Sequence, residues 1–103
     1  MMLAQWNIDA KFGHKSHVIE SLKKWQQEIG CQIGWTNDKV RMITGSIGVP
    51  ESRICNEVVF ENMAELDASW KKLGDIPAHA QWSKELEPFV VSGSMYWQIY
   101  RIL

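Results

Sequence analysis

The period of the hydrophobic pattern changes along the chain, and the order of these changes restricts the fold more than any other feature. Residues 2–12 place apolar side chains at every second position, which is typical of a strand with one apolar face. A helix follows, for which we expect Ser16 as the N-cap and Gly30 as the stop. Residues 39–48 and 54–61 are then predicted to form two strands of a hairpin with a longer loop.

The second half returns to a helix and then to a strand. Asn62, with Glu65 three residues later, resembles a capping box and predicts a helix that ends at Gly74. A second short helix is expected to start at Pro77, and residues 90–103 predict a final strand. The element order is therefore β-α-β-β-α-β, with the second helix broken in two.

This order is the ferredoxin-like arrangement of the α+β class, and 103 residues suffice for a single domain over positions 1–103. Right-handed crossovers put the helices on one face of a four-stranded antiparallel sheet. The final strand, 90–103, is apolar on both phases, so the uncovered sheet face also needs cover. We therefore expect a homodimer that packs sheet against sheet.

Charge and terminal sequence limit the partners and the compartment. The 11 Lys and Arg balance 12 Asp and Glu without clustering, which predicts no nucleic-acid partner. No apolar run approaches the roughly 18–20 residues of a membrane helix, and the first residues lack the features of a signal peptide. We expect a cytoplasmic protein without a membrane partner, in which Cys31 and Cys55 are reduced thiols.

With these elements, the chain resembles the dimeric α+β barrel superfamily and, within it, the NIPSNAP-like proteins. The residues that carry the resemblance are Asn56-Glu57-Val58-Val59-Phe60-Glu61, the helix with Ala64, Leu66 and Trp70, the helix with Trp82, and Val90-Val91-Ser92-Gly93-Ser94. The resemblance implies a homodimer whose sheets form a barrel with the helices outside. The superfamily includes cofactor-free and haem-degrading monooxygenases, isomerases, small cyclases and ligand-binding domains, so the fold alone does not define the function.

Asn7, Trp70 and His79 are the strongest candidates for a catalytic set, because the haem-degrading branch has an Asn, a Trp and a His on corresponding elements. The resemblance implies that His79 would ligate haem iron and that Asn7 would hydrogen-bond bound oxygen or substrate. The alternative is structural: Trp70 belongs to the core, Asn7 satisfies a polar spot in the barrel, and His79 is a solvated helix residue.

His14 and His17 lie three residues apart at the start of the first helix. Two imidazoles at this spacing would suit a metal or acid–base chemistry, but no carboxylate or cysteine has a matching spacing, so we predict no metal. In the small cyclases of the superfamily a histidine acts as base near a tyrosine, and Tyr96 or Tyr100 would be that partner here. The alternative is a pair of surface histidines.

Arg41 shares its strand phase with Ile43. It would meet an anionic substrate, or it would pair with Glu57 or Glu61 across the hairpin.

Six tryptophans are the unusual feature of the composition. Trp25, Trp70 and Trp82 fall on apolar helix stripes, and Trp6 and Trp97 fall on strand faces. They are expected in the core or the dimer interface, or around a pocket for a flat aromatic ligand.

The function predicted from these features is binding of a small hydrophobic or aromatic molecule, without a cofactor. The alternative is a cofactor-independent monooxygenase, isomerase or cyclase that acts on an aromatic or quinone-like substrate. The catalytic candidates are Asn7, His14 and His79, and an enzyme would require Asn7 and one histidine to face a common cavity. The candidate ligand-binding residues are Trp6, His17, Arg41, Trp70, Trp82, Tyr96 and Trp97.

Overall fold

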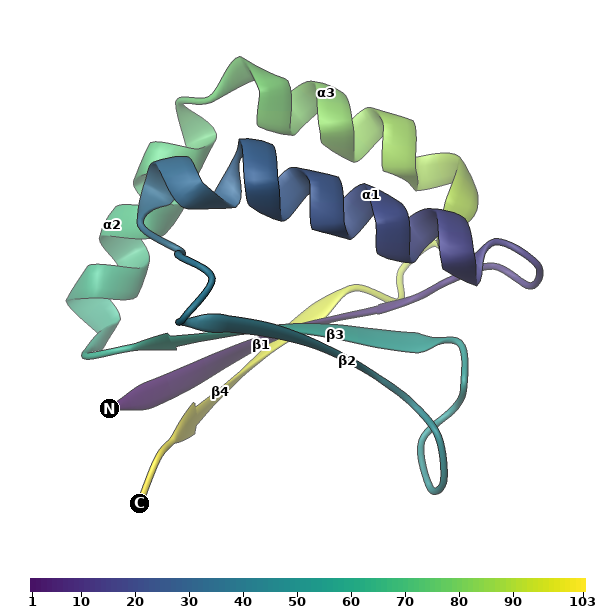
Figure 1. Ribbon diagram of the computed structural model, residues 1–103, viewed down its shortest axis with the longest axis horizontal. Helices are drawn as coiled ribbons and strands as arrows, with labels where there is room; N and C mark the ends of the chain where they lie inside the picture. The colour runs from purple at the N-terminus through teal and green to yellow at the C-terminus, as the bar shows by residue number, and fades with distance from the viewer.

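The computed structural model describes all 103 residues and has the predicted order of elements (Figure 1). These elements are β1 (Met2–Asp9), α1 (Lys15–Glu28), β2 (Val40–Thr44), β3 (Arg53–Phe60), α2 (Met63–Gly74), α3 (Pro77–Leu86) and β4 (Tyr96–Arg101). Short 3₁₀ turns follow α1 at Gly30–Ile33 and α3 at Glu87–Phe89. No helix is long and apolar enough to cross a bilayer.

The four strands form one antiparallel sheet in the order β2-β3-β1-β4, and the three helices all lie on the same side of it (Figure 1). The predicted ferredoxin-like α+β fold is therefore confirmed. Side chains alternate between the faces of β1, so Ala4, Trp6 and Ile8 point towards the helices while Leu3 and Asn7 point away. We call the second side the open face, because no element of the chain covers it.

The core lies between the sheet and the helices, in two adjoining clusters. Leu66 and Trp25 belong to the first cluster, and Leu22 and Ile54 belong to the second. Leu22, Ile54 and Leu66 are at most 1% exposed, so the helices are held to the sheet by complete burial of their apolar stripes.

Several elements begin or end elsewhere than predicted. Strand β1 ends at Asp9 rather than at residue 12, and Phe12 beyond it is fully exposed. Helix α1 begins at Lys15 with His14 at its N-cap, so Ser16 is not the cap. Strand β2 stops at Thr44 rather than continuing to residue 48. Gly45 follows, packed so closely against the Pro50 carbonyl that a side chain at position 45 would collide with it.

The predicted final strand 90–103 is also too long, since β4 starts only at Tyr96. Val90 makes a single bridge to Ala10, and a turn then follows in which Gly93 has a φ of +78°. This turn places Val91, Ser92, Gly93 and Met95 where they line the pocket described below.

The predicted cap of α2 is confirmed. Asn62 Oδ1 accepts a hydrogen bond from the Glu65 amide at 3.0 Å, and the Glu65 carboxylate accepts one from the Glu61 amide at 2.8 Å. Lys71 and Lys72 in the last turn suit the negative end of the helix dipole.

We expect Asn62→Ala to lower the free energy of unfolding by about 1 kcal/mol, because one helix amide loses its acceptor. Urea unfolding followed by circular dichroism measures the change. Asn62→Ser should restore most of it, and Asn37→Ala, at an exposed loop position, is the control. An Asn62→Ala protein as stable as the wild type would show that the cap contributes nothing.

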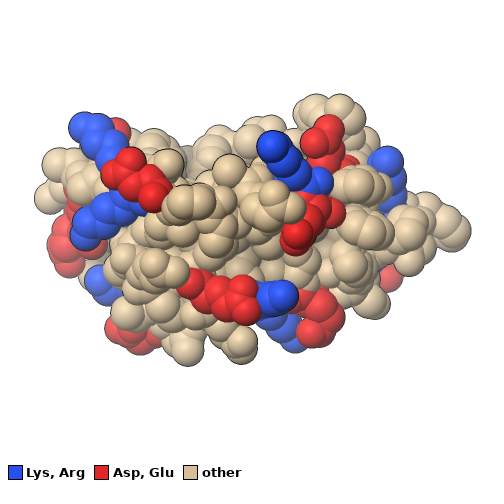
Figure 2. Space-filling view, turned by 90° about the horizontal axis from the view of Figure 1, so that it is seen from above, with Lys and Arg blue, Asp and Glu red and all other residues tan.

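Acidic and basic side chains are interspersed on the helical side of the molecule, as Figure 2 shows. Two pairs follow helix spacing: Lys71 with Asp67 at 3.0 Å and Lys23 with Glu20 at 3.9 Å. This surface carries no single-sign patch of the kind that a nucleic-acid backbone requires.

Candidate functional site

A cavity of about 710 Å³ lies between the sheet and the helix layer, and 15 of its 23 lining residues are hydrophobic. All of the chain's tryptophans line it: Trp6, Trp25, Trp35, Trp70, Trp82 and Trp97. We call this cavity the tryptophan pocket. Its wall includes four of the predicted ligand-binding residues, Trp6, Trp70, Trp82 and Trp97, together with His79.

The fold brings the indoles together from every layer. Trp6 and Trp97 are cross-strand neighbours on β1 and β4, on the face that meets the helices. Trp70 from α2 meets the Trp97 ring edge to face, with centroids 5.3 Å apart. Trp25 from α1 lies 5.8 Å from both Trp35 and Trp82. Most of these rings are held by other rings, so the pocket wall is largely preformed.

His79 is held in one protonation state by its neighbours. Trp25 Nε1 donates a hydrogen bond to His79 Nδ1 at 3.0 Å, so the neutral imidazole carries its proton on Nε2. Trp82 lies nearly parallel to the imidazole, at 21° and 5.8 Å, and its own Nε1 donates to Ser21 Oγ at 2.9 Å. Burial lowers the pKa of His79 below its ordinary value, so the ring stays uncharged at neutral pH.

This lowered pKa predicts how stability depends on pH. In the unfolded chain His79 takes up a proton near its ordinary pKa of about 6.5, whereas the folded protein resists protonation. Stability attributable to His79 is therefore complete above about pH 6.5 and falls as the pH drops towards the folded pKa. Protonation also removes the acceptor for Trp25.

We expect His79→Asn, which keeps an acceptor for Trp25 but does not titrate, to lose less stability than the wild type between pH 7.5 and 5. Urea unfolding at each pH provides the comparison. His14→Asn removes an exposed histidine and should keep the wild-type dependence. Equal pH dependence in the His79→Asn and wild-type proteins would rule out this role for His79.

The residues do not fit the haem site that the resemblance implied. An imidazole ligates iron through an unprotonated nitrogen, and here Nδ1 accepts the Trp25 hydrogen bond while Nε2 carries the proton. The structure also has no group of three or more His, Cys, Asp or Glu side chains placed to hold a metal ion.

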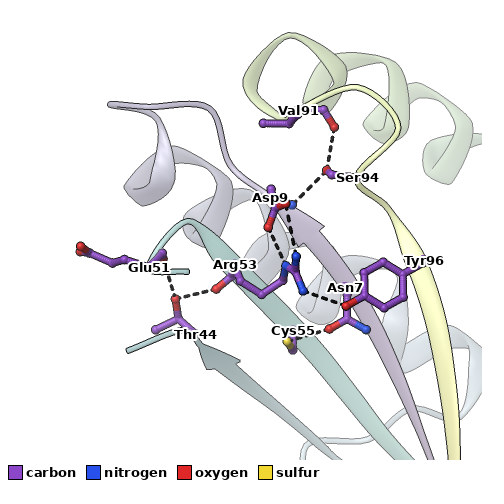
Figure 3. Close-up of polar contacts among 9 residues, drawn as sticks. All are labelled: Asn7, Asp9, Thr44, Glu51, Arg53, Cys55, Val91, Ser94 and Tyr96. Atoms are coloured by element: carbon purple, nitrogen blue, oxygen red, sulfur yellow. Dashed lines mark hydrogen bonds and ion pairs between the residues drawn. The ribbon is translucent and has the colours of Figure 1, made fainter. Parts of the chain in front are cut away.

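The remaining candidates on the sheet lie on the open face (Figure 3). Asn7 is 2% exposed and accepts a hydrogen bond from the Cys55 thiol at 2.9 Å. Burial raises the pKa of Cys55, which keeps this thiol protonated and able to donate. Tyr96 accepts a hydrogen bond from Arg53 Nη1 at 2.7 Å, and Arg53 Nε also bonds Asp9 at 2.6 Å.

Arg41 also lies on the open face. It donates a hydrogen bond to the Glu57 carboxylate, which accepts a second hydrogen bond from Gln5 Nε2 at 2.8 Å. Of the alternatives for Arg41, the pair with Glu57 is the one that the structure contains. Glu57 is only 3% exposed, whereas the Arg41 side chain is 71% exposed, so Arg41 neutralises a buried carboxylate from the surface of the sheet.

His14 and His17 lie at the start of α1 beside Phe89, with ring centroids 5.4 and 3.9 Å from it, and neither lines the tryptophan pocket. Asn7 points away from all three histidines, on the other side of the sheet. Within one chain, Asn7 and the histidines therefore do not share the common cavity that the enzyme alternative requires.

Trp25 and Trp35 line the pocket but were not among the predicted ligand-binding residues. The sequence placed Trp25 on an apolar helix stripe and left a core, interface or pocket position open, and Trp35 lies in a segment, residues 31–38, that has no strand or α-helix pattern. For Trp35 the number of tryptophans was the only sequence signal.

No family model and no curated protein matches the chain. Solved structures do match over the whole fold. An uncharacterized NIPSNAP domain protein from Burkholderia xenovorans is 15% identical, with a TM-score of 0.71 over 100% of this chain and 95% of that one. A NIPSNAP family protein from Agrobacterium tumefaciens is 12% identical, with a TM-score of 0.75 over 99% and 85%.

A candidate antibiotic biosynthesis monooxygenase from Nitrosomonas europaea is 9% identical to this chain, with a TM-score of 0.68 over 100% and 99%. At these identities the likeness concerns the fold. The chain thus has the fold of NIPSNAP domain proteins and of proteins described as monooxygenases, which confirms the predicted resemblance at that level.

Proposed function

We propose that the protein is a homodimer whose tryptophan pocket binds a small hydrophobic or aromatic molecule. The observation that carries this proposal is that six tryptophans from all parts of the chain line a single cavity. A chain that needed these rings only for its core would be expected to pack them without leaving about 710 Å³ between them.

The size and lining of the pocket support a small-molecule ligand. Binding sites for such ligands are typically about 300–1,000 Å³, mostly apolar, and contain a few polar groups that orient the ligand. His79 Nε2–H, as a neutral donor in the wall, is one such group. Indole faces offer flat apolar surfaces at little entropic cost, because neighbouring rings already hold most of them.

The alternative is a cofactor-independent oxygenase, isomerase or cyclase, and the neighbours described as monooxygenases are its support. We favour binding for a reason of geometry. Asn7 and His79 lie on opposite sides of the sheet, and the imidazole presents a donor N–H at Nε2 rather than a basic nitrogen. Neither arrangement suits proton abstraction from a substrate in the pocket.

The open face supports the homodimer. Four apolar or aromatic side chains there or at its edge are 39–47% exposed: Ile43, Tyr96, Tyr100 and Ile102. The Arg41–Glu57 and Arg53–Asp9 pairs cancel their charges. A second copy of the same face would therefore cover apolar surface without net repulsion between like charges.

The compartment that we propose is the cytoplasm. Cys31 and Cys55 are both free thiols. Cys55 donates to Asn7 and Cys31 to the Gln26 carbonyl at 3.3 Å, so both act as ordinary thiols, as is usual in a reducing compartment.

Titration with 2-naphthol, a neutral planar probe, tests the pocket. We expect saturable quenching of tryptophan fluorescence and a matching calorimetric heat. Trp97→Leu should weaken binding at least fivefold, whereas Phe12→Ala, which removes a fully exposed aromatic ring outside the pocket, should not change it. If the folded wild-type protein binds no 2-naphthol at millimolar concentration, the proposed function is wrong.

A further inference from the structure

We propose that the tryptophan pocket selects an organic cation, namely a quaternary ammonium or protonated amine attached to an apolar or aromatic body. This inference rests on the proposed function, because it names the ligand class of the same pocket. Two features of the wall support it: its six aromatic indole rings and the sign of its charges.

Aromatic rings dominate the pocket wall, which six indoles line. The face of an aromatic ring is the negative part of its quadrupole, and indole attracts cations more strongly than the other aromatic side chains do. We infer that a cation in a cavity lined by six indoles would make cation–π contacts with them. Cages of this composition are the usual protein solution for quaternary ammonium ligands.

The charges of the wall have one sign. No lysine or arginine lines the pocket, and its only charged residues are Glu57 and Glu87. The Glu57 carboxylate is held by Arg41 and Gln5 on the open face, so Glu87 provides the negative charge beside the pocket. His79 adds no opposing charge, because its neutral ring accepts the Trp25 hydrogen bond.

A pair of isosteric probes separates the effect of charge from that of shape. (4-Hydroxyphenyl)trimethylammonium and 4-tert-butylphenol have the same outline and differ by one positive charge. Isothermal calorimetry with the wild-type protein at low salt should give at least tenfold tighter binding of the ammonium compound. Glu87→Gln should reduce this preference at least threefold, whereas Glu85→Gln, an equal charge change at an exposed α3 position outside the pocket, should preserve it.

Equal or tighter binding of 4-tert-butylphenol would overturn the selection of a cation and leave the proposed function intact. Binding of neither probe would refute both. A preference for the ammonium compound that is unchanged in Glu87→Gln would support the role of the ring faces and assign the selectivity to them alone.

Discussion

Trp25→Ala is expected to lower the free energy of unfolding by about 3–5 kcal/mol, a large share of the total stability of a domain of this size. Trp25 is 5% exposed and contacts the rings of Trp35, His79 and Trp82. Its removal opens a cavity and leaves His79 Nδ1 without its donor. Urea unfolding followed by circular dichroism gives the difference.

The conservative variant separates packing from hydrogen bonding. Trp25→Phe retains most of the apolar volume but removes the indole N–H, so we expect a loss of about 1–3 kcal/mol from the unpaired imidazole nitrogen. Lys24→Ala, at the adjacent exposed position, should change stability by less than about 0.5 kcal/mol. If Trp25→Ala costs no more than Lys24→Ala, the ring is not the centre of the helix–sheet packing.

The fold was predictable because its signals are local. Ala4, Trp6 and Ile8 alternate along β1, and Val18 and Leu22 recur at helical spacing along α1, so each element can be recognised within its own segment. The order of these segments then leaves few topologies. The open face was equally predictable, since helices on one side of a sheet leave the other side bare.

The ends of elements were less predictable because long-range contacts determine them. Val90 and Val91 have strand-forming side chains, yet they precede a turn. Ser94 Oγ accepts a hydrogen bond from the Asp9 amide at 3.1 Å and donates one to the Val91 carbonyl at 2.7 Å, which holds this turn against β1. Asp9 and Ser94 are 85 positions apart, so no pattern within residues 90–103 could reveal the contact.

The candidate site was predicted only in part, for a related reason. Tryptophan as a residue type pointed to an aromatic pocket, and four of the named indoles do line one. The sequence could not decide which phase of β1 faces the helices, because Asn7 on one phase and Trp6 on the other are both plausible inside. The Trp25–His79 hydrogen bond joins residues 54 positions apart and has no sequence signature.

Leu3→Lys is expected to convert the proposed homodimer into a monomer. Leu3 lies between Val59 and Tyr100 in one row of the open face. In a single chain the new ammonium group reaches water, but two packed sheets would bury it without a partner, at a cost of several kcal/mol. Native mass spectrometry and sedimentation should show a mass near twice 11.9 kDa for the wild type and near 11.9 kDa for the variant.

Ala68→Lys, the same gain of charge at an exposed position of α2, should remain dimeric. The tryptophan pocket lies on the helix side of the sheet, and Leu3 is not among its lining residues. The monomeric Leu3→Lys protein should therefore still bind 2-naphthol, with an affinity within about twofold of the wild type if assembly and binding are independent. A dimeric Leu3→Lys protein would place the interface elsewhere, and a monomeric wild type would refute the homodimer. Loss of both assembly and binding in a folded variant would mean that sheet packing is needed to hold the pocket in its binding shape.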